Sequence, residues 1–230
     1  MDSKDIAAYY DSFSAKQEKT AVNARHRTIL RRLKKAGLQH SHHVLEIGCG
    51  IGTLTGLLAA YLSGGTVTGT DISPKSIALA KKRLSKYSNA ELFVTDMADF
   101  SQEKKFDVIV LPDVLEHIPL ENHREIFSTV RAHLHEDGFV AINIPDPYYN
   151  DWVRENKPEL LQIIDLSLLT DRLLQDAYAN SLHLHFFEAY SLFTHDPNYN
   201  WIVLKPDRPF REGGPGKLMK AIENYVIRLR

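Results

Sequence analysis

Acidic residues and glycines share one short stretch of the chain. Glu46 is followed by Gly48, Gly50 and Gly52, and Asp71 comes nineteen residues after the last of these glycines. Glycines at this spacing let the backbone approach a bound molecule where a Cβ atom would clash. A carboxylate at the position of Asp71 can accept hydrogen bonds from the hydroxyls of a ribose. These residue types predict a pocket for a nucleoside.

The spacing of the glycines separates two kinds of nucleoside ligand. A dinucleotide site has the pattern G-x-G-x-x-G, and Thr53 stands here where the third glycine is needed. Glu46 would repel a pyrophosphate, but it suits a cationic group such as an amine. A turn whose glycines serve packing alone is the alternative, and it leaves the positions of the acidic residues unexplained.

Strands and helices must hold these residues in place. Residues 53–62 predict a helix directly after the glycines, and residues 25–37 predict another before them. Apolar and β-branched runs predict buried strands at residues 44–47, 66–70, 89–94, 106–111 and 138–144. A period of two at residues 182–190, followed by residues 200–204, predicts a final pair of strands.

The pattern E-x-G-x-G-x-G at residues 46–52 resembles the first motif of class I S-adenosylmethionine (SAM)-dependent methyltransferases, and residues 44–144 follow that family's order of elements. The resemblance implies an α/β fold: a Rossmann-like, seven-stranded, mostly parallel sheet with an antiparallel C-terminal hairpin. Helices would cover both faces, and a helical insertion would follow the fifth strand. The implied cofactor is SAM, which leaves as S-adenosylhomocysteine.

The same resemblance implies which residues hold the cofactor. Asp96 would bond the adenine amine, Met97 would lie beside the ring, and Ile72 would pack on it, although an apolar residue there also suits a core. The full implied set is Tyr10, Glu46, Gly48, Cys49, Gly50, Asp71, Ile72, Asp96, Met97 and Leu111.

Two of these assignments have alternatives. Tyr10 belongs to a tyrosine-rich stretch, residues 9–13, that resembles the lid of small-molecule methyltransferases and could meet the sulfonium through a cation–π contact. Tyr9 and Phe13 could instead anchor a helix to the body. Cys49 is expected to be a small side chain beside the cofactor and not a nucleophile. A cation among residues 25–27 could bond the methionyl carboxylate, but a solvated basic face is the default interpretation of these residues.

Catalytic candidates follow the fourth strand. Leu115-Glu116-His117-Ile118-Pro119 resembles the L-E-H-I/V element of ubiquinone-biosynthesis-type O-methyltransferases. A hydroxyl acceptor needs a base that works near neutral pH, and histidine meets that need. His117 is therefore the first candidate for a general base, with loop ordering as its alternative role. His183 and His185 share one strand face and are further candidates, unless they form the polar face of an edge hairpin.

The same region could hold a metal ion. Asp113, Glu116 and His117 could face one cation, as in the comparable E-x-x-E-H-H element of small-RNA 2′-O-methyltransferases. Here an aspartate replaces the first glutamate, and Ile118 replaces the second histidine. Because this removes a ligand, no metal is expected.

Beyond the fifth strand the chain departs from the minimal fold. Residues 145–149 predict a proline-punctuated loop, and leucines at helical spacing in residues 151–180 predict two helices broken near residues 166–167. This insertion would cover the acceptor site or form a dimer surface. Tyr148, Tyr149 and Trp152 would line the acceptor pocket. The domain plan is an N-terminal helical lid region (1–40), a methyltransferase domain (41–205), and a linker with an amphipathic helix (206–230).

Composition fits this plan. The chain has 230 residues, 43% hydrophobic and 25% charged, which suffices for one domain with a sizeable core. A net charge of -1 gives no overall footprint for nucleic acid, and one cysteine excludes an internal disulfide. With no apolar leader and no run of about 18 apolar residues, we expect a cytoplasmic protein without a membrane partner.

The expected function is O-methylation of a small molecule, such as a sugar, a glycan precursor or a secondary metabolite. The expected partner is that acceptor, with no nucleic acid and with a homodimer as an option. N-methylation, a protein or RNA acceptor, and a SAM-binding module without turnover stay open at this point. The glycine spacing argues against an oxidoreductase.

Overall fold

The computed structural model describes residues 6–12, 22–98 and 100–208. The predicted C-terminal amphipathic helix and Phe13 of the tyrosine-rich stretch lie outside these residues. Among the described residues, no helix combines the length and the apolar character that crossing a membrane requires.

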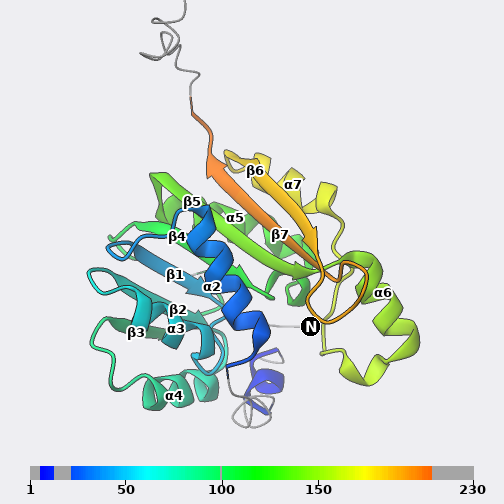
Figure 1. The fold of residues 1–230 in the computed structure, drawn as a ribbon, viewed down its shortest axis with the longest axis horizontal. Helices are drawn as coiled ribbons and strands as arrows, with labels where there is room; N and C mark the ends of the chain where they lie inside the picture. The colour runs from blue at the N-terminus through cyan, green and yellow to red at the C-terminus, as the bar shows by residue number, and fades with distance from the viewer. Residues whose placement is uncertain (1–5, 13–21, 99, 209–230) are drawn as a thin grey trace, which may run out of the picture.

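A single seven-stranded sheet organises the chain, with the order β3-β2-β1-β4-β5-β7-β6 (Figure 1). The strands β1 to β5 run parallel, and β7 is antiparallel to both β5 and β6. Their bounds are β1 (His43–Ile47), β2 (Thr66–Asp71), β3 (Ala90–Val94), β4 (Phe106–Pro112), β5 (Leu134–Pro145), β6 (Leu182–Tyr190) and β7 (Tyr199–Pro206). The strand order reverses between β1 and β4, which opens a crevice at the carboxyl ends of these strands.

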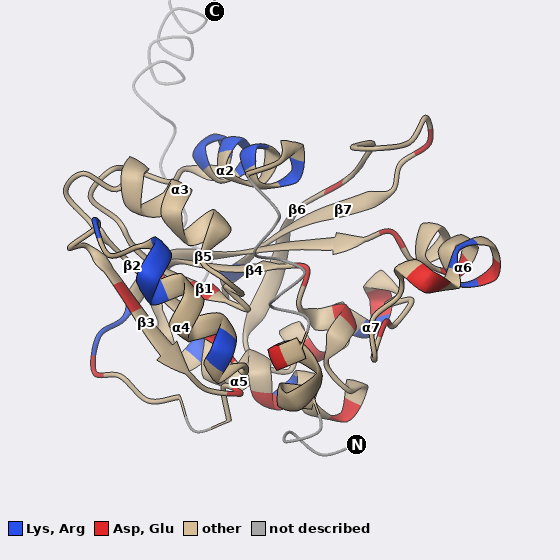
Figure 2. Cartoon of the chain, turned by 90° about the horizontal axis from the view of Figure 1, so that it is seen from below, with Lys and Arg blue, Asp and Glu red and all other residues tan. Residues whose placement is uncertain are grey.

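Helices cover both faces of the sheet. Figure 2 shows α2 and α3 on one side and α5 and α7 on the other. The α-helices include α2 (Ala24–Ala36), α3 (Thr53–Tyr61), α4 (Pro74–Arg83), α5 (His123–His133), α6 (Pro147–Asn156) and α7 (Thr170–Tyr178). Short 3₁₀ turns occur at η1 (Leu115–His117), η2 (Leu120–Asn122) and η3 (Pro158–Leu160). Residues 6–12 are also helical.

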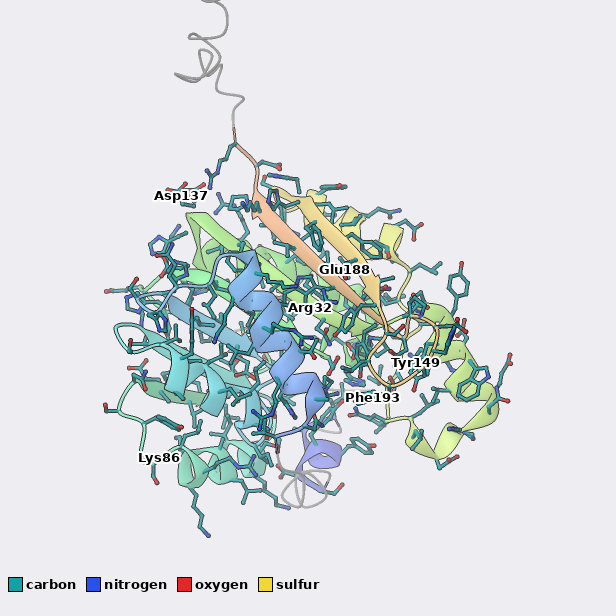
Figure 3. The ribbon with its side chains drawn as sticks, in the orientation of Figure 1. Arg32, Lys86, Asp137, Tyr149, Glu188 and Phe193 are labelled. Carbon is teal, nitrogen blue, oxygen red and sulfur yellow. The ribbon has the colours of Figure 1, made fainter. Side chains whose placement is uncertain are left out.

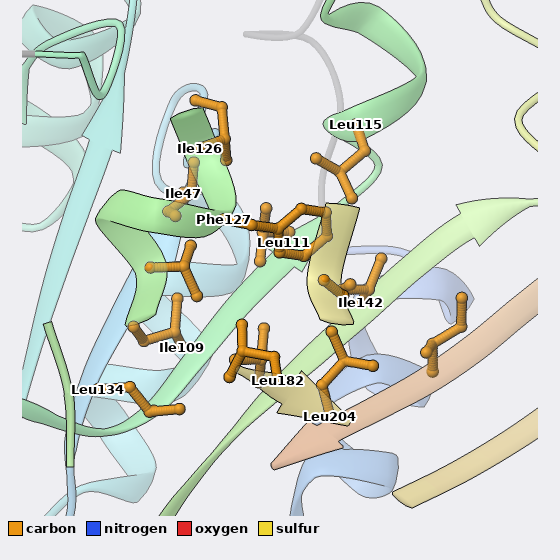
Figure 4. Packing of buried hydrophobic residues seen from close by; sticks show 14 of the residues in the cluster. Ile47, Ile109, Leu111, Leu115, Ile126, Phe127, Leu134, Ile142, Leu182 and Leu204 are labelled. Carbon is orange, nitrogen blue, oxygen red and sulfur yellow. The ribbon is translucent and has the colours of Figure 1, made fainter. Parts of the chain in front are cut away.

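The two faces of the sheet form two separate cores, because successive side chains of a strand point in opposite directions. In β4, Val108 and Val110 join the cluster under α2 and α3, whereas Ile109 and Leu111 join the cluster under α5 and α7. Figure 4 shows the second cluster, in which Phe127 of α5 is fully buried against the sheet. This continuous burial on both faces explains why the central strands have no polar face.

The predicted fold class is confirmed. The insertion holds two helices, α6 and α7, as predicted, but their bounds differ and the break between them is longer than expected. The proline-punctuated stretch at residues 145–149 opens α6, because Asp146 caps the backbone N–H groups of Tyr148 and Tyr149 and Pro147 occupies the first turn. The leucine-rich stretch that was expected to be helical runs irregularly between η3 and α7. One reason is that Leu166 donates its backbone N–H to the carbonyl of Glu116, 2.8 Å away, and not to a helical neighbour.

Candidate functional site

A cavity of about 520 Å³ lies at the carboxyl ends of β1, β2 and β4. This size falls in the range of small-molecule and cofactor sites. Its walls come from the glycine loop after β1, the ends of β2 and β3, and the segment that follows β4. Helix α2 and the helical residues 6–12 add the remaining sides, and Gln162 adds one side chain from the insertion.

The glycine loop brings backbone to the cavity wall. Gly48, Gly50 and Gly52 have φ values of 74°, 52° and 77°, a left-handed region that other residues adopt at a cost. A Cβ atom on Gly48 would lie 2.3 Å from Cγ2 of Val114. The N–H groups of Gly48 and Cys49 donate to the carbonyl of Thr70 at 2.8 Å, which ties the loop to β2. The sequence pattern therefore reflects a real backbone requirement.

Glu46 is a buried carboxyl group on this wall. It is 2% exposed, and its Oε2 atom has no hydrogen-bond partner among the described residues. Burial raises the pKa of Glu46 to about 8. A buried carboxyl oxygen without a partner is costly, so the site is suited to a cationic ligand group that would pair with Oε2.

Asp71 closes β2 and points at the glycine loop. Its Oδ2 atom accepts a hydrogen bond from the N–H of Gly50 at 2.8 Å, and its Oδ1 atom accepts one from Ser73 at 2.9 Å. Burial raises the pKa of Asp71, and these two hydrogen bonds oppose the rise. Because a carboxylate has about four lone-pair sites, the fixed group still has room for two ligand hydroxyls.

The end of β3 supplies a neighbouring wall. Asp96 and Met97 both line the cavity, together with Ile72. Met97 has a φ of 75° and is 3% exposed. Thr95 and Asp96 stabilise this unusual turn, because their side-chain oxygens accept from the N–H groups of Met97 and Ala98 at 3.0 and 3.1 Å. The result is a polar rim beside a flat apolar patch.

The N-terminal helical residues cover part of the cavity. Ile6 and Tyr10 line it, and Asp11 accepts hydrogen bonds from the Ser73 hydroxyl at 2.6 Å and from the Lys75 N–H at 3.1 Å. The ring of Tyr10 meets the ring of His117 edge-on, with centroids 6.3 Å apart. Burial raises the pKa of Tyr10, so it is a neutral phenol at physiological pH.

Helix α2 contributes a cation that is held by the segment after β4. Arg25 lies 2.6 Å from Oδ2 of Asp113, and this pairing raises the pKa of the guanidinium. Asp113 has a φ of 56°, and its Oδ1 atom accepts from the Asn143 amide at 2.9 Å. Tyr190 donates to that amide's oxygen at 2.6 Å. The ion pair is therefore supported by a polar chain that reaches across β5 to β6.

The same helix places a histidine on the wall. His26 accepts a hydrogen bond on Nδ1 from the N–H of Asn23. Burial and the cations Arg25 and Arg83 lower the pKa of His26 to about 4. This ring is neutral near pH 7 and can act as a hydrogen-bond donor toward the cavity wall.

His117 sits in η1, where both of its ring nitrogens have partners. Nδ1 lies 2.7 Å from the carbonyl oxygen of Ile164, and Nε2 lies 2.9 Å from the amide nitrogen of Gln162. A carbonyl can only accept, so Nδ1 carries the hydrogen and Nε2 of the neutral ring presents a lone pair. Glu116, behind the ring, is 2% exposed, and burial together with Asp113 raises the pKa of this carboxyl well above its usual range.

Comparison with known proteins gives this geometry a family. Residues 45–140 match the family model of a methyltransferase domain. Trans-aconitate 2-methyltransferase of Shigella flexneri serotype 5b (strain 8401) is 28% identical over 137 residues, which are 60% of this chain and 49% of that protein. The chain thus spans about half the length of the curated relatives it matches.

Solved structures show the same fold. Magnesium protoporphyrin IX methyltransferase from Synechocystis PCC 6803, with bound S-adenosylhomocysteine (SAH), has a TM-score of 0.70 at 18% identity and covers 88% of this chain and 99% of its own. The SAH complex of the N-methyltransferase NodS from Bradyrhizobium japonicum WM9 has a TM-score of 0.62 at 20% identity, covering 80% and 86%. The match over residues 45–140 and the shared fold support a class I SAM-dependent methyltransferase.

The residues that line the cavity fit SAM, the cofactor of the methyltransferases that this chain resembles. The buried Oε2 atom of Glu46, which has no hydrogen-bond partner among the described residues, suits the ammonium of a methionyl group. The glycine loop leaves space that Cβ atoms would fill, and Asp71 is an anchored acceptor for a diol. All predicted cofactor residues except Leu111 line this one cavity.

Several predicted residues lie elsewhere. Leu111 points to the face of β4 that packs under α5. It is therefore fully buried in that core and does not line the cavity. His183 pairs with Asp207 at 3.1 Å, and His185 is exposed. Both belong to β6, the edge strand of the sheet, so the structure brings neither to the cavity. Tyr148 and Trp152 are 77% and 46% exposed on α6, and they do not line it either.

Other residues at the site had no recognised signal in the sequence. Asn143, Tyr190 and Gln162 reach the site through contacts between distant segments. In the described part of the chain, no group of at least three His, Cys, Asp or Glu side chains is arranged to hold a metal ion. Cys49 is buried and its thiol pKa is raised well above the usual range, which disfavours the thiolate that a nucleophile requires.

Proposed function

We propose that this methyltransferase transfers the methyl group of SAM to a hydroxyl of a small-molecule acceptor, with His117 as general base. The observation that carries this proposal is the state of the His117 ring. The Ile164 carbonyl holds the hydrogen on Nδ1, so Nε2 faces Gln162 on the cavity lining with a lone pair that can take a proton. SAM supplies an electrophilic methyl on a sulfonium when it is bound.

The chain's own residues would bind and orient the cofactor. Asp71 would accept the ribose hydroxyls, Glu46 would pair with the amino group, and Asp96 would bond the adenine amine beside Met97 and Ile72. Gly48, Cys49 and Gly50 would give the backbone its close approach, and Tyr10 would exclude water from above. The common support for these roles is that each residue lines the same cavity.

A small acceptor is favoured by the enclosure of the site. Tyr10 covers one side, and the insertion reaches the cavity through Gln162. Helix α2 is rich in Lys and Arg (Figure 2). Cations that would suit a nucleic acid lie around a separate groove, which is lined by Arg27, Arg31, Lys34 and Lys35. The insertion is therefore proposed as a cover over the acceptor, and residues 1–40 as a lid region.

N-methylation of an amine is a second candidate, favoured by a different observation. Carboxyl groups surround His117: Glu116 and Asp165 each lie 3.8 Å from one of its ring nitrogens, and Asp113 is close by. Such an environment would also attract a cationic amine before it loses its proton.

Methyl-labelled SAM distinguishes these candidates. The purified chain and a His117→Ala variant would be incubated with sets of hydroxyl and amine acceptors, and labelled products would be identified by mass. O-methyl products that require His117 support the proposal. Products labelled at nitrogen favour the second candidate, and cofactor binding without any transfer favours a module without turnover.

A further inference from the structure

Gln162 is the insertion's contribution to the cavity wall, and its position is fixed by the loop around it. Its backbone N–H donates to Oδ2 of Asp165 at 2.7 Å. Leu166 lies further along the loop. Its backbone N–H donates to the Glu116 carbonyl at 2.8 Å, and its carbonyl accepts from the Asn150 side-chain amide at 3.0 Å. The loop is thereby fastened both to η1 and to α6.

The side chain of Gln162 is hydrogen-bonded to Nε2 of His117, the nitrogen that would act as the general base. Because the Ile164 carbonyl can only accept, His117 Nδ1 is the donor, and Nε2 accepts from the Gln162 amide nitrogen at 2.9 Å. The amide oxygen of Gln162 is buried and has no hydrogen-bond partner among the described residues. The Gln162 amide therefore makes a hydrogen bond through its nitrogen only. That bond uses the lone pair on Nε2 that an acceptor hydroxyl would need.

Binding of an acceptor must therefore displace the amide. A hydroxyl that donates its hydrogen to Nε2 takes the place of the Gln162 N–H there. The Gln162 side-chain amide is then left without a hydrogen bond at its nitrogen or at its oxygen. Buried amides in that state are costly, so an acceptor that satisfies the amide binds better than one that does not. In the free protein the amide nitrogen lies 2.9 Å from Nε2. Because the loop that carries Gln162 is fastened, the displaced amide stays close to the ring, and its new partner must lie near the reacting hydroxyl.

We infer that Gln162 is a specificity-determining residue and that it selects an acceptor with two neighbouring hydroxyls, a vicinal diol. One hydroxyl occupies Nε2 of His117, and the other bonds the Gln162 amide, whose oxygen can accept its hydrogen. The two oxygens of a gauche diol are about as far apart as two hydrogen-bonded atoms, so a diol at Nε2 places its second hydroxyl beside the ring, near the displaced amide. This inference rests on the proposed function, because it takes Nε2 to be the site of the reacting hydroxyl.

The proton balance of the step is simple. As the acceptor oxygen bonds to the methyl carbon, the carbon–sulfur bond breaks and the hydroxyl proton passes to Nε2. The hydrogen on Nδ1 stays with the Ile164 carbonyl throughout. The second hydroxyl keeps its hydrogen, so one of the two oxygens is methylated.

The test uses binding and not turnover. The full chain, labelled with ¹⁵N in its histidines and saturated with SAH, is titrated with cis-1,2-cyclohexanediol and with cyclohexanol, while the Nε2 resonance of His117 is followed. We expect the diol to bind about five- to tenfold more tightly than the mono-alcohol in the wild type, the range that one hydrogen bond supplies. We expect Gln162→Ala to reduce this ratio to within twofold.

Two further variants separate recognition from a structural effect. Gln162→Met keeps the length of the side chain and removes the amide, so it should lose the diol preference as Gln162→Ala does. Gln175→Ala changes an exposed glutamine of α7 and should keep the wild-type ratio. In the free protein, both Gln162 variants should shift the Nε2 resonance of His117, because they remove its donor, and Gln175→Ala should not.

The outcomes are decisive in both directions. Equal binding of the two probes to the wild type, a preference that survives in both Gln162 variants, or an Nε2 resonance that neither probe moves would overturn the inference. A diol preference that depends on Gln162, without methyl transfer to any acceptor, would instead contradict the proposed function alone.

Discussion

The buried carboxyl of Glu46 makes cofactor affinity depend on pH. With the pKa of Glu46 at about 8, this group is mostly protonated in the free protein at pH 6. Pairing with the ammonium of the ligand requires the ionised form, so binding must first remove the proton. The affinity should therefore rise as the pH rises toward 8 and then level off.

The magnitude follows from the pKa. If Glu46 is ionised throughout in the complex, the affinity should increase about 25-fold between pH 6 and 7.5, equivalent to about 1.9 kcal/mol. SAH is the ligand to use, and this range keeps its amino group largely protonated. Close to one proton should be released on binding at pH 6, measured by calorimetry in two buffers that differ in ionisation enthalpy.

Variants isolate the contribution of Glu46. Glu46→Gln should abolish both the pH dependence over this range and the proton release, because an amide does not titrate. Glu91→Gln changes an exposed glutamate of β3 and should retain both. His26, with a pKa of about 4, does not titrate here. An affinity for SAH that stays constant within twofold from pH 6 to 7.5 would refute the reasoning.

Four further results are expected. In the cofactor-free protein, Glu46 has a raised pKa, so its contribution to stability is present below about pH 4.5 and is lost as the pH rises toward 8; Glu46→Gln should become progressively more stable than the wild type over that interval in thermal unfolding. Asp71→Ala should weaken SAH binding by about 1–3 kcal/mol in calorimetry, through lost hydrogen bonds to a charged group, and unchanged affinity would remove Asp71 from the ribose. His117→Ala should lower the rate of methyl transfer about 100-fold or more and leave the Kd for SAH nearly unchanged, whereas His183→Ala and His185→Ala should keep full activity. Tyr190→Phe should cost about 1–3 kcal/mol in denaturant unfolding, because it leaves the buried Asn143 amide oxygen without its donor, and Tyr178→Phe at an exposed site should cost little.

Much of the fold could be predicted because it depends on local signals. The strand that contains Glu46 and the strand that ends at Asp71 are apolar and β-branched runs bounded by turn residues. Both were placed correctly to within a residue or two. The glycine pattern marked positions with positive φ, and that requirement is local. The two helices of the insertion were predicted, but their bounds were not. Capping by Asp146 starts α6 earlier, and the bond from Leu166 to Glu116 belongs to a longer irregular segment than the leucine spacing suggested.

Site residues at the ends of strands could be predicted from the sequence. Site residues that depend on contacts between distant segments could not. Asp71 and Asp96 follow strands, so the sheet alone brings them to one edge. His183 and His185 were correctly placed on a strand, but the order of the strands puts that strand at the far edge. Gln162 meets His117 across 45 positions of the chain, and Tyr190 meets Asn143 across 47. Such contacts arise from packing, which a single sequence does not reveal.

Contacts between side chains on the outer surface also depend on how the elements pack. Figure 3 shows Arg32 of α2 beside Glu188 of β6, a pair joined at 2.7 Å, and the Arg32 guanidinium lies 3.8 Å from the centre of the Tyr190 ring. This contact fixes α2 on the sheet and so orients Arg25 and His26, which belong to the same helix and line the cavity. The helix is therefore a structural support for the site as well as a part of it.

A calorimetric titration of the purified chain and of Asp71→Ala with SAH, and with NAD as a control, tests the central claim most directly. We predict micromolar binding of SAH to the wild type, weaker binding to the variant, and no binding of NAD. Binding of NAD, or SAH affinity that Asp71→Ala leaves unchanged, would contradict the assignment of this cavity to the cofactor.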